Sequence, residues 1–271
     1  MDTVSELRTV GRRSANSSTM SGLARFGLLA RGVVYLLIGW LAMQIALGHH
    51  TEQANQRGAM ADVVHHSFGT VIVVLLGIGL GAYALWRFSE AAFGVTGEGR
   101  KTGPRLKSLG RGIVYAALCI STFAFLAGSS KGQDQQQASA TARLMRHGYG
   151  RWLVGLVGVI VIVIGLVMIR DGLKRKFERE LRMGELSGRT RSVVVWLGSV
   201  GTVARGVVFA IAGILVVDAA VSFDAKKSTG LDGALRTLAD RPFGQWLLGA
   251  LSLGVIAFGL FGLASARWAK T

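Results

Sequence analysis

Uncharged, mostly apolar stretches divide this chain into six segments of the length that a membrane-spanning helix requires. A helix needs about 20 mostly apolar residues to cross roughly 30 Å of hydrocarbon. Five stretches carry no charged residue: 32–48, 67–86, 112–130, 152–169 and 242–266. A sixth, 192–217, is interrupted only by Arg205. This pattern predicts six transmembrane helices and an all-α integral membrane protein.

The charge distribution predicts how the helices are oriented. The chain is 51% hydrophobic and carries a net charge of +16. A soluble protein with this charge would suggest a nucleic-acid partner, but Lys and Arg also collect on the cytoplasmic side of membrane proteins. With both termini in the cytoplasm, 21 basic residues lie inside and nine outside, Arg205 set aside. We therefore expect cytoplasmic termini, contact with anionic lipid headgroups on that side, and no nucleic-acid partner.

One short pattern recurs three times along the chain. An Arg-Gly pair followed by an aromatic residue opens a helix at Arg31, Arg111 and Arg205, and an aromatic-Gly pair opens the next helix at Phe68, Tyr149 and Phe243. The spacing predicts three two-helix repeats after a polar cytoplasmic segment: 1–21, then 22–95, 104–182 and 193–268. Each repeat enters and leaves on the same side, so the repeats are parallel, and we expect pseudo-threefold symmetry about the membrane normal.

Two further segments have helical spacing outside the predicted spans. Leu235 and Leu238, with counterparts at Met60, Val63 and Leu144, predict short amphipathic helices on the outer face. The sequence "DGLKRKFERELRMG" predicts a basic cytoplasmic extension of the fourth helix. Its apolar stripe, Leu173, Phe177 and Leu181, would lie on anionic lipid, with docking of a membrane protein partner as the alternative.

These motifs resemble a known family. The stretch "ARFGLLARGVVYLLIGWLAMQIALG" from Ala24 to Gly48, with its two weaker echoes, resembles the bacterial membrane family called domain of unknown function 1206. The resemblance covers nearly the whole chain and implies six helices as three repeats in a bacterial plasma membrane. The third copy departs from the pattern, with Phe209 for tyrosine and Ser199 where Arg25 and Arg105 stand. The resemblance implies no particular activity.

The repeated arginines are the first candidates for binding. Arg31 and Arg111 are expected to extend toward inner headgroups; alternatively, they and Arg205 converge on an axis and bind an anion or a lipid headgroup. Asp218 follows Arg205 by 13 residues, about 20 Å of helix, so one of these two charges is expected inside the membrane. Gln44 occupies the position of Asp218 in the first repeat and joins the candidate set.

Small residues repeat at helical spacing and predict close helix contacts. Seven residues after the glycine of each Arg-Gly pair stands another small residue, so both share a helix face. The predicted packing residues, including a Gly-x-x-x-Gly pair in the second span, are Gly32, Gly39, Gly112, Cys119, Gly206, Gly213, Gly77 and Gly81.

No residue pattern predicts catalysis or a metal site. The five histidines are expected to be solvated on the outer side, and no spacing such as His-Glu-x-x-His is present: His49, His50, His65, His66 and His147. We expect no enzymatic activity, no cofactor and no metal ion. The favoured hypothesis is a non-enzymatic protein that binds or organises other membrane components as a scaffold or accessory subunit. The alternative is a small transporter or channel for an anion, lipid or small molecule along the pseudo-threefold axis.

Overall fold

The computed structural model describes residues 18–49, 53–94, 102–128, 133–146, 149–222, 224, 227, 230–240 and 242–269. Most of the predicted segment 1–21 lies outside the described residues. Six described helices are long and apolar enough to cross a membrane: α2 (Ser18–Ala46), α4 (Gly69–Phe93), α5 (Thr102–Leu126), α7 (Gly150–Leu173), α8 (Gly188–Ser222) and α10 (Gly244–Trp268). The prediction of an all-α protein with six candidate membrane-spanning helices is confirmed.

A short helix joins the two long helices of each repeat: α3 (Gln56–Val64), α6 (Gln133–Met145) and α9 (Leu231–Ala239). The first turns of α3 and α9 are buried. Gln56 Nε2 donates a hydrogen bond to Thr122 Oγ1 at 2.8 Å, and the backbone amide of Ala54 donates to Asp232 Oδ1 at 2.7 Å. These bonds tie the three repeats together inside the bundle, so the predicted surface-lying arrangement does not extend to these turns.

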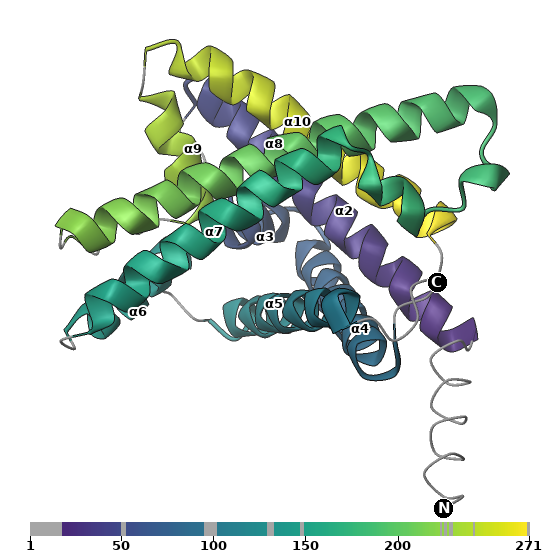
Figure 1. The fold of residues 1–271 in the computed structure, drawn as a ribbon, viewed down its shortest axis with the longest axis horizontal. Helices are drawn as coiled ribbons and strands as arrows, with labels where there is room; N and C mark the ends of the chain where they lie inside the picture. The colour runs from purple at the N-terminus through teal and green to yellow at the C-terminus, as the bar shows by residue number, and fades with distance from the viewer. Residues whose placement is uncertain are drawn as a thin grey trace, which may run out of the picture.

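The long helices pack most extensively across the boundaries between repeats. The second helix of each repeat lies against the first helix of the next, which gives the pairs α4 with α5, α7 with α8, and α10 with α2. Figure 1 shows α7 and α8 running side by side over α2 and α10. We call the end of the bundle where α2, α5 and α8 begin and α4, α7 and α10 end the terminal end, since the first and last described residues, Ser18 and Ala269, lie there.

Glycine allows two of these pairs to approach backbone to backbone. A Cβ on Gly206 of α8 would lie 2.7 Å from the carbonyl oxygen of Gly165 on α7, and one on Gly32 of α2 would lie 3.0 Å from that of Gly259 on α10. A larger residue at either place would force the helices apart. Four predicted packing residues lie at these two crossings, namely Gly32, Gly39, Gly206 and Gly213.

The third pair, α4 with α5, is held apart by side chains. A Cβ on Gly81 would lie 3.1 Å from Cys119 Sγ, and one on Gly77 would lie 3.1 Å from both Phe123 and Thr122. Gly112 faces the ring of Phe88. Cys119 occupies the position that glycine has in the other repeats. Its side chain therefore lies between α4 and α5, where the other two pairs have glycine backbone.

The second repeat differs from the other two because its long helices separate. In the described chain, α2 packs against α4 and α8 packs against α10, whereas α5 and α7 do not pack along one another. Only 17% of the hydrophobic stretch of α5 and of α7 is buried within the bundle, compared with 50% for α2 and 56% for α4 and α10. The pseudo-threefold symmetry stays a prediction, since one of three repeats is open.

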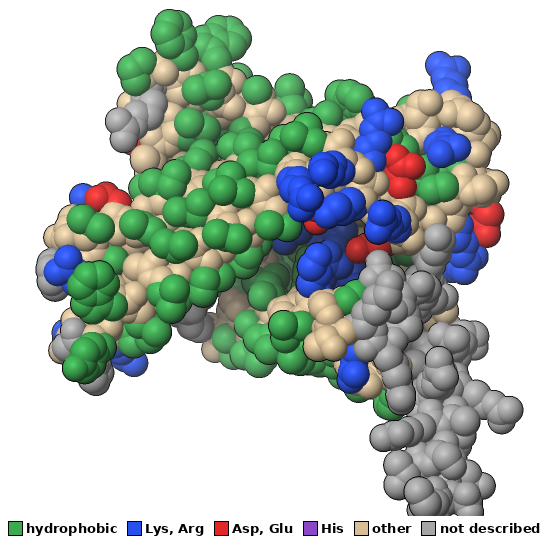
Figure 2. Space-filling view, in the orientation of Figure 1, with side chains coloured by type: hydrophobic (Ala, Val, Ile, Leu, Met, Phe, Trp, Pro, Cys, Tyr) green, Lys and Arg blue, Asp and Glu red, His purple; other side chains and the backbone are tan. Residues whose placement is uncertain are grey.

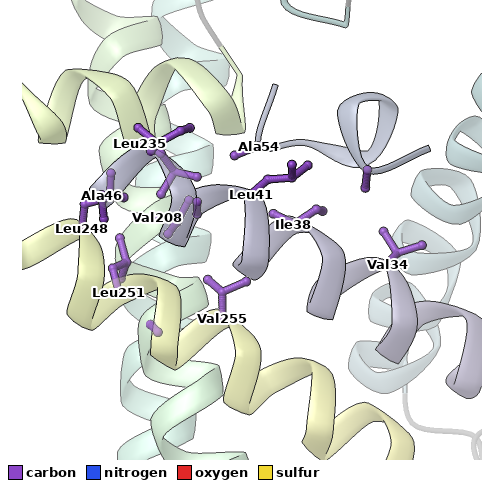
Figure 3. Packing of buried hydrophobic residues seen from close by; sticks show 14 of the residues in the cluster. Val34, Ile38, Leu41, Ala46, Ala54, Val208, Leu235, Leu248, Leu251 and Val255 are labelled. Atoms are coloured by element: carbon purple, nitrogen blue, oxygen red, sulfur yellow. The ribbon is translucent and has the colours of Figure 1, made fainter. Parts of the chain in front are cut away.

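An apolar core fills the space between α2, α8 and α10. Figure 3 shows side chains from these helices meeting beneath α3 and α9, and the cluster includes Val34, Ile38, Leu41, Val208, Leu248, Leu251 and Val255. Ala54 and Leu235, from the segments that open α3 and α9, close it on the side away from the terminal end. Burial of these apolar side chains and the close glycine contacts together fix the positions of the three helices.

The aromatic-Gly pairs form the same junction in every repeat. A Cβ on Gly69, Gly150 or Gly244 would collide with the carbonyl oxygen of the residue six positions earlier, which is Val63, Leu144 or Leu238. Only glycine fits there, because the short helix closes directly onto the start of the long one. The preceding aromatic side chains are 81–88% exposed, the arrangement expected of anchors at a membrane–water interface: Phe68, Tyr149 and Phe243.

The predicted basic extension of the fourth helix is not a helix on the membrane surface. α7 ends at Leu173, and Arg175 adopts a left-handed conformation with φ 51°. The chain then folds back over the terminal end through the short turns η1 (Lys176–Glu180) and η2 (Met183–Glu185). Leu181 is 2% exposed and pairs with Ala269. The helical interpretation was wrong because Phe177 and Leu181 pack on the bundle, while Leu173, the last residue of α7, is 69% exposed.

Candidate functional site

Ionisable and aromatic side chains from several repeats meet near the terminal end of the bundle. We call this group the arginine cluster and define it by its members on α2, α4, α5, α8, α10 and the connection after α7: Arg31, Tyr35, Tyr83, Arg87, Glu90, Arg111, Glu180, Arg205 and Phe258. The three Arg-Gly arginines therefore lie in one region of the bundle, with Arg111 more exposed than Arg31 and Arg205.

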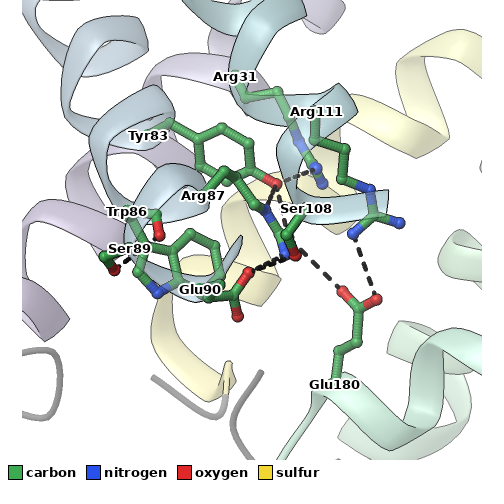
Figure 4. A network of polar contacts seen from close by, with 9 residues as sticks. All are labelled: Arg31, Tyr83, Trp86, Arg87, Ser89, Glu90, Ser108, Arg111 and Glu180. Atoms are coloured by element: carbon green, nitrogen blue, oxygen red, sulfur yellow. Dashed lines mark hydrogen bonds and ion pairs between the residues drawn. The ribbon is translucent and has the colours of Figure 1, made fainter. Parts of the chain in front are cut away.

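Tyr83 lies at the centre of the network that Figure 4 shows. Its side chain is fully buried, and its hydroxyl oxygen accepts hydrogen bonds from Arg87 Nε at 2.9 Å and Arg87 Nη2 at 2.7 Å. Arg31 Nη1 also donates to this oxygen, at 3.3 Å. One phenol from the first repeat thus orients guanidinium groups of α2 and α4 side by side.

Arg87 has its own counter-charge. Its Nη1 lies 2.7 Å from Glu90 Oε2, both residues are buried, and Ser108 Oγ donates to the same carboxylate oxygen at 2.9 Å. The guanidinium also lies 4.2 Å from the ring centre of Trp86. Removing either partner of such a buried ion pair would leave an uncompensated charge, which costs about 3–5 kcal/mol. Sequence reasoning missed this pair, because Arg87 ends an uncharged run and resembles an ordinary flanking charge.

Arg31 and Arg205 are surrounded by rings instead of carboxylates. Their guanidinium carbons lie 5.2 and 5.0 Å from the ring centre of Phe258, and Arg205 also lies 5.0 Å from that of Tyr35. The Nε atoms of both arginines are buried and have no hydrogen-bond partner among the described residues. Cation–π contacts stabilise a desolvated guanidinium but leave its N–H donors unused. Arg31 therefore points into the bundle, and the expectation that it extends to headgroups was wrong.

Arg111 and Glu180 lie at the accessible edge of the arginine cluster. Arg111 Nη1 lies 3.4 Å from Glu180 Oε1, and Arg87 Nη2 lies 3.9 Å from Glu180 Oε2. The two side chains are 44% and 61% exposed. Partial desolvation at this edge raises the pKa of the Glu180 carboxyl, but the positive charges of Arg111, Arg87 and Arg31 outweigh that effect and hold the pKa below its usual value. Glu180 is therefore ionised at neutral pH.

The arginine cluster carries more positive than negative charge. Its four arginines face two carboxylates, Glu90 and Glu180, among the described residues. Figure 2 shows that the molecule is hollowed between α7 and α5, with Lys and Arg side chains gathered beside the hollow. Planar guanidinium groups with unused donors match the oxygens of carboxylates and phosphates. The arrangement can bind an anion.

The other predicted binding residues lie elsewhere. Asp218 is near the opposite end of α8, where its Oδ2 lies 3.0 Å from Lys227 Nζ and the side chain is 48% exposed. Arg205 is thus the charge enclosed in the bundle, and Asp218 is paired at the helix end. Gln44 is half-buried in the last turn of α2, away from the terminal end. The structure therefore brings together three of the five candidates.

The described histidines lie at the surface. His49, His65 and His66 are exposed, whereas His50 and His147 lie outside the described residues. The described part of the chain contains no group of three His, Cys, Asp or Glu side chains able to hold a metal ion.

Comparison with known proteins identifies the repeats. The model of a family described as "Domain of Unknown Function (DUF1206)" matches this chain three times, at residues 26–94, 106–175 and 200–269. The three matches confirm the predicted repeat organisation. The chain is also similar to a Bacillus subtilis (strain 168) protein described as "Uncharacterized protein YxxB", with 28% identity over 242 residues that cover 88% of this chain and 87% of that protein. No solved structure matches.

Proposed function

Because this chain belongs to the DUF1206 family, whose match spans all three repeats, we propose that it is a non-enzymatic membrane protein that binds another membrane component. The binding site is the arginine cluster. The observation that carries this proposal is the unused donor capacity of Arg31 and Arg205, whose buried Nε atoms have no partner among the described residues. A buried donor without a partner costs about 1–3 kcal/mol, so a ligand that supplies acceptors gains that energy.

The distribution of basic residues along the chain supports a location and an orientation. We place the protein in a bacterial plasma membrane with both termini in the cytoplasm, because 21 basic residues then lie inside and nine outside. The arginine cluster is near the terminal end and thus faces the cytoplasmic leaflet. Anionic headgroups and the membrane-proximal parts of partner proteins are the groups it meets there.

Transport along a central axis receives less support. The space between α2, α8 and α10 is filled by apolar side chains such as Ile38, Leu41 and Val208. Asp218, which a polar path would share with the arginines, lies near the other end of α8 and is paired with Lys227. The tight glycine contacts at two helix crossings also favour a fixed bundle over one that alternates between two openings.

Extraction from native membranes into nanodiscs tests the proposal. Mass spectrometry of the intact particles identifies what co-purifies in stoichiometric amount with the full chain. We expect one anionic lipid or one membrane protein, retained about threefold less by Arg111→Gln, since an ion contact at an exposed edge contributes up to about 1 kcal/mol. Arg170→Gln is the control, because Arg170 is exposed on α7 outside the arginine cluster. Particles with no stoichiometric companion, or one retained equally by Arg111→Gln, would refute the proposal.

A further inference from the structure

The separation of α5 from α7 gives the arginine cluster a route to the lipid bilayer. The other two repeats close this route, because α2 packs on α4 and α8 packs on α10. In Figure 1, α5 and α7 diverge away from the end that carries α6, toward the terminal end, and Figure 2 shows the hollow between them. The opening lies in the wall of the bundle, so it faces the membrane interior and not only the water beyond the helix ends.

We propose that the ligand of the arginine cluster is the phosphate group of an anionic phospholipid, which enters sideways between α5 and α7. This inference rests on the proposed function and specifies its ligand. The phosphate lies against the guanidinium groups of Arg31, Arg111 and Arg205, and the acyl chains remain in the gap between the two helices.

The donor chemistry fits a phosphate. A guanidinium presents N–H groups in a planar fork that pairs with two oxygens of one phosphate. Arg87 is neutralised by Glu90. The contacts that Arg31 and Arg205 make within the described part of the chain are with the Tyr83 hydroxyl and with aromatic rings. A phosphodiester offers one negative charge and several acceptor oxygens, which is the complement that these two side chains lack.

The two helices that border the gap carry exposed apolar surface that acyl chains can cover. Large apolar side chains on both helices are exposed, among them Ile113 and Ile120 on α5, at 57% and 70%, and Val163 and Leu166 on α7, at 51% and 55%. A free inorganic anion would gain nothing from this apolar surface, whereas a lipid covers it with its acyl chains. The combination of a basic cluster near one membrane face and an apolar lateral opening therefore favours a lipid over a soluble anion.

Glu180 is the group that the phosphate displaces. Its carboxylate lies between Arg111 and Arg87, at the exposed edge of the arginine cluster. The next residue, Leu181, pairs with Ala269 and holds the connection in place. Because Glu180 is negatively charged, it competes with an incoming anion for Arg111. Removing this charge strengthens binding of the lipid, whereas loss of a merely structural contact would weaken it or leave it unchanged.

The test is titration of the purified full-length protein with short-chain phosphatidylglycerol, followed by native mass spectrometry, with phosphatidylcholine and inorganic phosphate as separate arms. We expect phosphatidylglycerol to bind more tightly than both, Glu180→Gln to increase its affinity by about fivefold, and Arg111→Gln to decrease it by a similar factor. Glu185→Gln is the matched control: Glu185 lies on the same connection, is 58% exposed and pairs with Arg182 outside the arginine cluster.

The outcomes separate this inference from the proposed function. Equal binding of phosphatidylglycerol and phosphatidylcholine, binding of inorganic phosphate alone, or weaker binding in Glu180→Gln would overturn the lipid assignment. A protein partner in the nanodisc experiment, together with no preference for phosphatidylglycerol, would leave the proposed function standing and remove this ligand. Melting temperatures of all variants, compared with wild type, show that each one is folded before its affinity is interpreted.

Discussion

Arg31 and Arg205 keep their charges inside the helix bundle because aromatic rings replace the water that they lose. Phe258 is the residue that both share, since each guanidinium carbon lies about 5 Å from its ring centre. The rings orient the two side chains but leave N–H groups free to bind. At the residue scale, Phe258 therefore has two roles: it is part of the apolar interior, and it holds the basic groups in place.

Replacing Phe258 should destabilise the protein by more than the loss of its apolar packing would. We expect Phe258→Leu to lower the free energy of unfolding by about 1–2 kcal/mol more than Phe261→Leu, because only the first change removes cation–π contacts to two arginines. The two phenylalanines are matched, since both are on α10 and are 5% and 6% exposed. Denaturation in mixed detergent micelles measures the difference. Equal decreases in the free energy of unfolding would mean that Phe258 contributes only apolar packing.

At the scale of helices, glycine decides how closely the backbones of packed pairs approach one another. The pairs α2 with α10 and α7 with α8 meet through glycine backbones, whereas α4 and α5 are separated by side chains such as Cys119 and Phe88. The helices of the second repeat are each bound to a neighbouring repeat and not to each other. The opening beside the arginine cluster is a consequence of these unequal contacts.

A single methyl group at a glycine crossing tests this account. We expect Gly206→Ala to destabilise the protein by about 1–3 kcal/mol, because its Cβ would lie 2.7 Å from the carbonyl oxygen of Gly165. Gly155→Ala serves as the control on the facing helix, since a Cβ there meets only Ala220 at 3.7 Å, an ordinary contact. Thermal unfolding in detergent compares the two. If both variants melt at the wild-type temperature, the close crossing does not contribute to stability.

The sequence predicts the helices and repeats well, because both depend on local patterns. Run lengths identify all six spans, and the repeated Arg-Gly and aromatic-Gly pairs identify the three units. The site was only partly predictable. Glu180 and the Arg87–Glu90 pair depend on contacts between segments far apart in the chain, which periodicity does not reveal. The stripe ending at Leu181 was misread because a surface helix and a folded-back turn share the same apolar spacing.

For the whole molecule, the distribution of charge sets the orientation that the proposed site needs. In a background with Cys119→Ala, a membrane-impermeant maleimide should label Asp240→Cys in intact spheroplasts, and Lys174→Cys only after permeabilisation. Both residues are exposed, and they lie at opposite ends of the bundle. The expected pattern follows from the excess of Lys and Arg at the terminal end. The reverse pattern would place the arginine cluster on the outer face and remove the cytoplasmic leaflet as its source of ligand.

The most direct test of the central claim is a cryo-electron microscopy structure of the full chain in nanodiscs that contain phosphatidylglycerol. The central claim is that the arginine cluster binds the phosphate of a lipid that enters through the open second repeat. It predicts density for a phosphate within hydrogen-bond distance of Arg31 or Arg205, with acyl chains between α5 and α7 and Glu180 moved away from Arg111. A structure in which α5 and α7 pack together, with Glu180 still on Arg111 and no lipid between the helices, would contradict it.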